Sequence, residues 1–399
     1  MKLVLIHQHD PTVPHVGGIQ TFIDTFIRNA PEDFEISLLG VSTRPASYPV
    51  GRWHSLSIDN RGFRFFPLVA ADPVRLYRVP LSIRILWSLF RYKSEIGLHD
   101  GILEFHRVEP MLAFLGSNNP KVLFLHGHNR KDFYNRNTET RWGAFPRLYF
   151  WLENKLIPQA SHVYLVREDA VGDYQELYPG MQHKISFLPT WVDEAVFRSL
   201  NGREREDLRK RLMDGQRLSA ESKILLFVGR YERQKDPMRL LQAFHHVKSR
   251  EPRACLVMIG EGGFKAQMQK YIQENGLAAS VRLLPPMSQN EIGQWMNAAD
   301  ALCLSSAYEG MPRVAVEALY CGLPLVGTAV GETGRLIGDS RGGRLVTEEG
   351  VEPFARAVLD LFANPPSAAA CRKQVESFTA RRVLAPVYQY YRDVAGAKQ

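Results

Sequence analysis

The feature that most limits the possible folds is an alternation of short apolar runs with segments of helical periodicity, and it occurs twice along the chain. The first half has strand-like runs at 2–6, 35–41, 101–105 and 122–126, with helical segments such as 81–91 between them. The second half repeats the pattern, with expected strands at 224–228, 255–259, 281–284, 301–305 and 324–327 and expected helices at 237–249, 265–275, 289–298 and 312–321. Such alternation indicates parallel sheets covered by helices. The sequence therefore predicts an α/β protein of two tandem doubly wound, Rossmann-like domains.

The domain junction is expected where this pattern stops. Residues 193–222 include the charged run GREREDLRKRL and have few large apolar side chains, and a chain of 399 residues is long enough for two cores. We expect domains at 1–195 and 196–380, followed by a helix at 381–399 that could pack back on the first domain. Ligands of doubly wound sheets bind beyond the carboxyl ends of the strands, so the expected site is a cleft that the two sheets face.

Composition excludes several classes of protein. No run reaches the roughly 20 apolar residues of a membrane-spanning helix, and the start MKLVLIHQHD lacks the pattern of a signal peptide, so we expect a cytoplasmic protein. The cysteines form no CxxC pair and are expected to be packed, reduced thiols rather than a metal or redox site; they are Cys255, Cys303, Cys321 and Cys371. The net charge of +8 suits an anionic partner, and without a nucleic-acid-binding motif a phosphate ligand is preferred to nucleic acid.

The stretch SSAYEGMPRVAVEALYCGLPLVG, residues 305–327, is the most informative segment. Pro312 suits the first turn of a helix, Gly322 suits its C-terminal cap and Pro324 stops it, so a helix is expected at about 311–321. The free amides and the positive dipole end at its start would bind an anion such as a diphosphate.

Two glutamates in this stretch are candidate ligand-binding residues. Glu317 lies among apolar helix residues, where an unpaired carboxylate would cost several kcal/mol, so it needs a partner. That partner is either an internal arginine or a pair of ligand hydroxyls. Glu309 lies in the preceding loop beside Gly310.

A second cluster is VGRYERQKDP, residues 228–237. Arg230 and Lys235 follow the end of an expected strand, and Asp236 with Pro237 suits a helix start. The two cations would neutralise a diphosphate and stabilise it as a leaving group, or they are ordinary solvated surface charges.

The succession of GRYERQKD, IGEG, AADALCLSS and EGMPRVAVEALYCGLPLV resembles the family-4 retaining glycosyltransferases of the GT-B fold. The resemblance is continuous over residues 223–332 and weaker in the N-terminal half. It implies that Glu309 faces the donor sugar and Glu317 binds the ribose hydroxyls, with the diphosphate held by Arg230 and Lys235. The same loop and helix start would complete the donor site with Gly310, Met311, Pro312 and Arg313.

In the first half, the resemblance assigns the family's glycine pair to Gly17 and Gly18, which lack a Cβ and allow close approach of phosphate or acceptor. It assigns the histidine beside the donor sugar to His126. His128 raises the alternative of an HxH metal site, but no third ligand is near in sequence, so no metal or other cofactor is expected.

Two positions depart from the family pattern. Residues 285–287 are Pro-Pro-Met where a glycine near the nucleotide base is usual. Arg313 stands where a small or apolar residue is common, and it either adds a cation beside the diphosphate or is exposed.

A basic segment in the first half has two interpretations. Residues 61–93 contain seven basic residues and one acidic residue, and the helical part places Arg84, Ser88 and Arg91 opposite an apolar stripe. Such a helix either lies on an anionic membrane surface or packs on the α/β sheet.

The resemblance implies transfer of a sugar from a nucleoside-diphosphate donor to an acceptor hydroxyl, with retention and without a metal. Its usual setting is surface or exopolysaccharide assembly on glycan or lipid-linked acceptors, with the protein cytoplasmic or peripheral on the inner membrane face. A sugar-nucleotide epimerase of the same fold and a non-catalytic nucleotide-sugar-binding module are the alternatives. The sequence does not decide between UDP, GDP and ADP donors.

Overall fold

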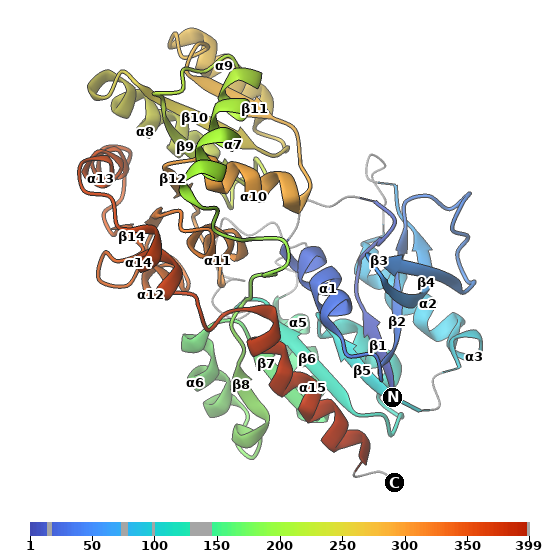
Figure 1. The fold of residues 1–399 in the computed structure, drawn as a ribbon. Coiled ribbons are helices and arrows are strands. Elements are labelled where there is room, and N and C mark those ends of the chain that lie inside the picture. The colour runs from blue at the N-terminus through green and yellow to red at the C-terminus, as the bar shows by residue number, and fades with distance from the viewer. Residues whose placement is uncertain (14–17, 73–78, 98–99, 128–145, 397–399) are drawn as a thin grey trace. The chain divides into compact units, whose positions relative to one another are not determined.

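The computed structural model describes residues 1–13, 18–72, 79–97, 100–127 and 146–396. The chain forms two compact units, each with a sheet and its own helices (Figure 1). The first unit comprises Met1–His15, Ile19–Pro189 and Arg381–Gln399, and the second comprises Val16–Gly18 and Thr190–Ala380. The chain thus passes to the second unit after Pro189, and its last helix belongs to the first.

The described strands of the first unit form one sheet in the order β3-β4-β2-β1-β5-β6-β7-β8, parallel except for the β3–β4 pair. The strands are β1 (Lys2–Ile6), β2 (Glu35–Ser42), β3 (His54–Ile58), β4 (Arg61–Ala70), β5 (Ile102–Phe105), β6 (Lys121–Leu125), β7 (His162–Leu165) and β8 (Ile185–Phe187). The helices are α1 (Gly18–Asn29), α2 (Leu81–Arg91), α3 (Lys93–Ile96), α5 (Pro146–Leu156), α6 (Glu168–Leu177) and α15 (Ala380–Gly396). Short 3₁₀ turns occupy Glu109–Phe114, Ile157–Gln159 and Gln182–Lys184.

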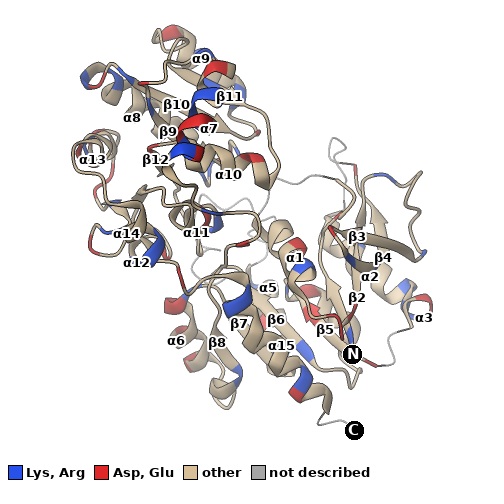
Figure 2. Ribbon diagram, in the orientation of Figure 1, with Lys and Arg blue, Asp and Glu red and all other residues tan. Residues whose placement is uncertain are grey.

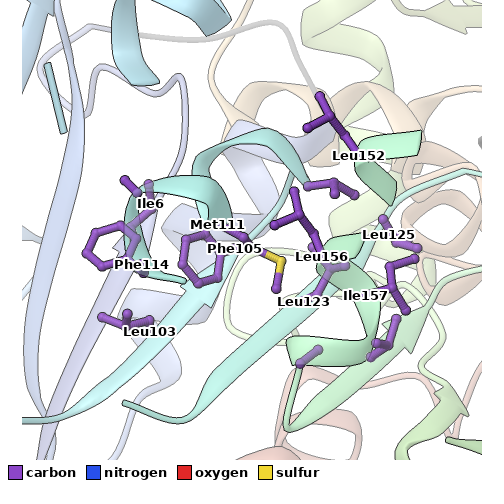
Figure 3. Close-up of a cluster of buried hydrophobic side chains, with 14 of the residues drawn as sticks. Ile6, Leu103, Phe105, Met111, Phe114, Leu123, Leu125, Leu152, Leu156 and Ile157 are labelled. Atoms are coloured by element: carbon purple, nitrogen blue, oxygen red, sulfur yellow. The ribbon is translucent and has the colours of Figure 1, made fainter. Parts of the chain in front are cut away.

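The strands β5 and β6 are buried along their whole length, as expected for parallel strands covered on both faces. Their side chains join a cluster of buried apolar residues that extends to the 3₁₀ turn at Glu109–Phe114 and to α5 (Figure 3). The four strands and the helix 81–91 that the sequence predicted for this half are present. The antiparallel pair of β3 and β4 was not predicted, because β3 is polar and only partly buried.

The second unit contains an entirely parallel sheet in the order β11-β10-β9-β12-β13-β14. Its strands are β9 (Lys223–Val228), β10 (Ala254–Ile259), β11 (Val281–Leu284), β12 (Ala301–Leu304), β13 (Leu325–Thr328) and β14 (Gly343–Val346). Its helices are α7 (Gly202–Gly215), α8 (Pro237–Arg250), α9 (Lys265–Glu274), α10 (Gln289–Ala298), α11 (Arg313–Tyr320), α12 (Thr333–Ile337), α13 (Glu352–Ala363) and α14 (Ala368–Lys373). Two doubly wound α/β units are therefore confirmed.

Each sheet has one point at which the winding direction reverses. In the second unit the chain runs from β9 outward to β11 and then returns to β12 on the other side of β9. In the first unit β1 and β5 are the corresponding neighbours. Connections leave two such strands toward opposite faces, and the resulting crevice at their carboxyl ends is where doubly wound sheets bind ligands.

The charged run that suggested a junction is a helix of the second unit. It forms α7, whose alternating red and blue segments are visible in Figure 2. Asn201 caps the helix, and Arg205 donates to the carbonyls of Asn297 and Ala299 at the end of α10.

The C-terminal helix α15 packs on the first unit through its tyrosines. Tyr388 donates to the carbonyl of Phe26 at 2.9 Å, and Tyr390 donates to the carbonyl of Ser161 at 3.0 Å. All four cysteines are buried and free, as expected for packed thiols. Within the described ranges, no helix is long and apolar enough to cross a membrane.

Candidate active site

Two loops of the second unit meet at its switch point. One follows β9 and runs through residues 229–236, and the other follows β12 and runs through residues 305–312. Ser305 donates its hydroxyl to the carbonyls of Lys235 and Asp236 at 2.8 and 2.9 Å, and the amide of Ala307 donates to the carbonyl of Gln234 at 2.8 Å. These hydrogen bonds hold the two predicted motifs side by side at the carboxyl ends of β9 and β12.

The centre of this arrangement is an ion pair between Lys235 and Glu309. Lys235 Nζ lies 2.5 Å from Glu309 Oε1, and the hydroxyl of Ser306 donates to the same oxygen at 2.6 Å. Glu309 is buried and Lys235 is partly buried. The sequence predicted both residues for this site but not their contact. Because an ammonium carries three N–H donors, Lys235 can hold Glu309 and still donate to another acceptor.

A third loop, which follows β13, packs against the backbone of Glu309 and Gly310. The amide of Glu332 donates to the carbonyl of Gly310 at 2.9 Å. Gly331 has a φ of +51°, and a Cβ at this residue would lie 2.0 Å from the Gly310 carbonyl oxygen. Only glycine fits there, since both the backbone conformation and the space exclude a side chain. Sequence reasoning missed Gly331, although a glycine shortly after a parallel strand is a signal of a backbone contact at that sheet edge.

Helix α11 begins at Arg313, with Pro312 as its N-cap residue. Met311, just before it, is buried, and its carbonyl accepts a hydrogen bond from the Thr190 hydroxyl at 3.2 Å. The helix start therefore has a fixed position at the end of the 305–312 loop. Its first amides have no partner within the helix, as at any helix N-terminus.

Glu317 has an internal arginine as partner, which is one of the two alternatives that the sequence left open. Arg313 Nε donates to Glu317 Oε1 at 2.7 Å, one helical turn away, and both side chains are 8% exposed. Burial raises the pKa of Glu317, while Arg313 opposes this rise. The expectation that Arg313 could be exposed is wrong, because its guanidinium is the counter-ion of a buried carboxylate.

Arg230 is exposed at the other end of the 229–236 loop, where its guanidinium donates to Gln234 Oε1 at 3.1 Å. Asp236 caps α8 as expected, since its carboxylate accepts from the amide of Arg239 at 3.1 Å. Pro285 and Pro286, which replace the usual glycine, are exposed after β11.

The first unit brings histidines together at the carboxyl ends of its strands. His126 follows β6 directly, and its Nε2 lies 2.9 Å from Nδ1 of His106, which follows β5. The ring of Phe22, from α1, meets the His126 ring edge to face with centroids 4.8 Å apart. His126 is thus held by His106, directly after β5, and by Phe22 of α1.

Gly18 is the first residue of α1, and a Cβ there would meet no described atom within 4 Å. Packing within the described parts of the protein therefore does not require a glycine at this position. Gly17 and His128 lie outside the described residues, so the glycine pair and the HxH pair are described only in part. Among the residues that the structure describes, no group of three or more His, Cys, Asp or Glu side chains could hold a metal ion.

Sequence reasoning also missed a buried glutamate next to these histidines. Glu104 lies in β5, is fully buried, and approaches His106 Nε2 with its Oε1 at 3.0 Å. Its other oxygen accepts the hydroxyl of Tyr391 from α15 at 2.5 Å. The available signal was a single acidic residue inside an otherwise apolar strand, ILEF.

Comparison with known families indicates what kind of domain contains Lys235, Glu309 and Glu317. Residues 209–378 match the family model described as "Glycosyl transferases group 1". Most of the second unit thus matches the group 1 glycosyltransferase family. The matched segment contains both glutamates, Arg230, Lys235 and the Gly331 loop.

Curated relatives carry the same kind of name. A D-inositol 3-phosphate glycosyltransferase of Paenarthrobacter aurescens is 31% identical over 218 residues, which is 53% of this chain and 52% of that protein. A D-inositol 3-phosphate glycosyltransferase of Corynebacterium urealyticum is 29% identical over 405 aligned positions, which cover 96% of this chain and 92% of the relative. The first of these alignments spans only about half the length of the relative.

Solved glycosyltransferase structures share the fold of the whole chain. Sucrose-phosphate synthase from Thermosynechococcus elongatus superposes with a TM-score of 0.79 at 18% identity, covering 99% of both chains. Anabaena HepE, solved in complex with UDP-glucose, superposes with a TM-score of 0.70 at 16% identity, covering 100% of both chains. The predicted GT-B fold is therefore confirmed.

Proposed function

We propose that this protein transfers a sugar from a nucleoside-diphosphate-sugar donor to an acceptor hydroxyl, with retention of the anomeric configuration. The observation that carries the proposal is the Lys235–Glu309 pair, which lies at the switch point of the unit that matches the group 1 glycosyltransferase family. This pair places an anion and a cation side by side, and a donor sugar and its diphosphate need opposite charges next to each other.

Lys235 is proposed to bind the diphosphate. One of its N–H groups is directed to Glu309, which leaves donors for phosphate oxygens. Arg230, exposed on the same loop, and the amides at the start of α11 add positive potential. When the bond between the anomeric carbon and the diphosphate breaks, these groups stabilise the negative charge on the leaving group.

Glu309 is proposed to act at the sugar. Positive charge develops at the anomeric carbon as the leaving group departs, and a buried carboxylate beside it lowers the energy of that transition state. Ser306 and Lys235 hold one carboxylate oxygen and thereby fix the orientation of the group. Preorganisation of this kind avoids reorientation during the reaction.

Glu317 is proposed to bind the ribose hydroxyls of the donor. Arg313 donates to Oε1 of Glu317, and the proposal assigns Oε2 as the acceptor for a ribose hydroxyl. His126 of the first unit is proposed to contact the sugar, and Gly17 with Gly18 is proposed to allow close approach of donor or acceptor. Neither a metal nor another cofactor is part of the proposal, because Lys235, Arg230 and the helix start provide the charge neutralisation.

A donor panel tests this function. Thermal-shift measurements with UDP, GDP and ADP identify the nucleoside, and UDP-glucose is the first donor to try because Anabaena HepE binds it. D-inositol 3-phosphate is the first acceptor to try, given the names of the relatives. We expect release of nucleoside diphosphate only when acceptor is present, and a product whose anomeric proton coupling matches that of the donor sugar.

The same panel discriminates between the alternatives. Isomerised sugar nucleotide from donor alone would indicate an epimerase, and tight nucleotide binding without turnover on any acceptor would indicate a binding module. An inverted anomeric centre in the product would refute retention while leaving sugar transfer intact.

A lipid-linked acceptor in surface or exopolysaccharide assembly is the proposed biological setting, and helix α2 provides an observation in its favour. Ile85 and Leu89 of α2 are buried in the first unit, but Ile83, Trp87 and Phe90 are exposed at spacings of four and three residues, with Trp87 71% exposed. This exposed stripe is followed by the exposed cations Arg91 and Lys93. Together they suit the interface of an anionic membrane.

Part of the basic segment serves another purpose. Arg61 donates to the carbonyl of Pro31 at 2.8 Å, and Arg84 donates to the carbonyl of Ala70 at 2.7 Å. Membrane contact is therefore proposed for Trp87 and Phe90 with Arg91 and Lys93, and not for the whole segment.

Flotation with vesicles of neutral and anionic lipid tests this contact. We expect the wild type to float with anionic vesicles at low salt, and Trp87→Ser with Phe90→Ser to abolish flotation. Leu345→Ser, at an exposed leucine of the second unit, is the matched control and should change nothing. Equal flotation of the α2 variant and the control would refute the contact.

A further inference from the structure

A chain of hydrogen bonds runs through the first unit from a buried tyrosine to His126. Tyr391 donates to Glu104 Oε2 at 2.5 Å, Glu104 Oε1 lies 3.0 Å from His106 Nε2, and His106 Nδ1 lies 2.9 Å from His126 Nε2. Tyr391, Glu104 and His106 are buried, whereas His126 is partly exposed. The chain therefore connects the interior with a residue that can meet a ligand through its remaining nitrogen, Nδ1.

The direction of these hydrogen bonds depends on whether the carboxyl group of Glu104 carries a proton. An ionised Glu104 can only accept hydrogen bonds, so His106 must donate from Nε2. Its Nδ1 then accepts a hydrogen bond from the N–H group at Nε2 of His126. His126 then has a bare lone pair at Nδ1. A protonated Glu104 donates to His106 Nε2, every bond beyond it reverses, and His126 carries its hydrogen on Nδ1. Neutral imidazoles transmit the difference because each has one donor and one acceptor.

The surroundings keep the histidines neutral and allow Glu104 to titrate. The titratable groups that face Glu104 are Tyr164 of β7, Tyr388 and Tyr391 of α15, and His106. Burial raises the pKa of Glu104 to about 8, and the hydrogen bond from Tyr391 opposes this rise.

Among the described residues, His7 faces both histidines and His9 faces His106, while Arg107 faces His7. Burial and, to a smaller extent, His9 lower the pKa of His106 to about 3, and burial also holds the pKa of His126 well below its usual range. Both rings are therefore neutral at neutral pH, and the Glu104–His106 contact joins a carboxyl group to an uncharged imidazole.

We propose that Glu104 is a positioning residue, which acts through His106 to decide whether His126 offers an N–H donor or a lone pair to the ligand. The part that concerns the ligand rests on the proposed function, in which that ligand is the donor sugar. Below the pKa of Glu104 the site presents an N–H group to a sugar oxygen, and above it the site presents an acceptor. The chain thereby links donor recognition to pH without placing a charge on His126.

The tautomer of His126 is measured directly, without any ligand, by ¹⁵N NMR of the full-length protein labelled at histidine. The His126 signals are assigned by their loss in His126→Gln. We expect the hydrogen on Nδ1 at pH 6 and on Nε2 at pH 9.5, with a midpoint near the pKa of Glu104, about 8.

Glu104→Gln should fix the low-pH arrangement. Its amide oxygen accepts from Tyr391 and its NH₂ group donates to His106 Nε2, so it reproduces the protonated carboxyl. We expect Nδ1–H at every pH in this variant. An unchanged tautomer across pH in the wild type, or the same switch in Glu104→Gln as in the wild type, would overturn the proposal.

Tyr391→Phe provides a test of direction. It removes a hydrogen bond that favours the ionised carboxyl, so the pKa of Glu104 rises and the switch moves to higher pH. Tyr390→Phe is the matched control, because Tyr390 is on the same helix but donates to the carbonyl of Ser161. A shift of equal size in both variants would show a general effect of α15 and would contradict the assignment.

Kinetics extend the test to the proposed function. We expect the KM for the donor to rise about fivefold from pH 7 to pH 9 in the wild type, as for loss of one hydrogen bond, and to stay level in Glu104→Gln. A tautomer switch in a protein without transfer activity would support the positioning role and refute the proposed function. Transfer activity in a protein whose His126 tautomer does not change with pH would support the proposed function and refute the positioning role.

Discussion

Replacement of Arg313 by methionine removes the counter-ion of Glu317 and leaves a carboxylate buried in α11. Both side chains are 8% exposed and joined at 2.7 Å, so solvent compensates little for the loss. Breaking a buried pair on one side costs about 3–5 kcal/mol of unfolding free energy. For a domain of this size, a loss of about 3 kcal/mol lowers Tm by roughly 6–12 °C.

The loss should depend on pH, with a sign that follows from the pKa of Glu317. Burial raises this pKa above that of the unfolded chain, and removal of Arg313 raises it further. The unfolded carboxyl therefore ionises first as pH increases, and stability falls as pH rises through the interval between the two pKa values. Arg313→Met should be destabilised less at pH 4 than at pH 8.

Thermal unfolding without nucleotide, at both pH values, measures this effect. The double variant Arg313→Met with Glu317→Leu removes the buried charge, and it should recover stability relative to Arg313→Met at pH 8 and lose the added pH dependence. Wild-type stability in Arg313→Met at pH 8 would show that Arg313 does not stabilise the buried Glu317 carboxylate. So would an equal loss from Arg313→Met whether residue 317 is glutamate or leucine.

Three further predictions concern the site loops. Gly331→Ala should reduce the affinity for nucleoside diphosphate at least tenfold by calorimetry, since its Cβ would lie 2.0 Å from the Gly310 carbonyl oxygen. Gly276→Ala is the control, because Gly276 also has a positive φ but lies in open space, and this variant should bind normally. Equal affinities of the two variants would argue against a supporting role for Gly331. Lys235→Met should weaken binding of the diphosphate about tenfold or more without changing binding of the nucleoside alone, and equal loss for both would contradict its phosphate contact. EDTA should not change turnover, and a loss restored by magnesium or manganese would reject metal independence.

Much of the fold could be predicted because local signals coincide with tertiary constraints. The parallel strands are mostly apolar since both faces are covered, and proline and glycine mark the ends of the helices, as at Pro237 and Gly322. The loop after β9 was found because Arg230 follows an apolar strand, and the loop after β12 was found because Pro312 and Gly322 mark the ends of the helix that follows it. That Glu309 and Lys235 touch is a consequence of sheet order, which local sequence does not contain.

The features that escaped prediction depend on distant partners. Glu104 is recognisable as part of a chain only when Tyr391, 287 residues later, lies against it. The run GREREDLRKRL suggested a domain junction because it has few large apolar residues, but its Arg205 and Arg209 donate to carbonyls at the end of α10. Arg313 suggested an exposed or phosphate-binding cation, although its partner was four residues away on the same helix face.

Glu309 is proposed to act on the reacting sugar, and the variant Glu309→Gln tests this role. Glutamine keeps the size of the side chain and an acceptor for Ser306 but removes the charge, which should reduce kcat about 10²-fold or more. Binding of the free nucleoside diphosphate should remain near wild type or become tighter, because Lys235 loses its competing anion. A melting curve establishes that the variant is folded. Near-normal kcat in folded Glu309→Gln, or loss of its nucleotide binding, would contradict the account.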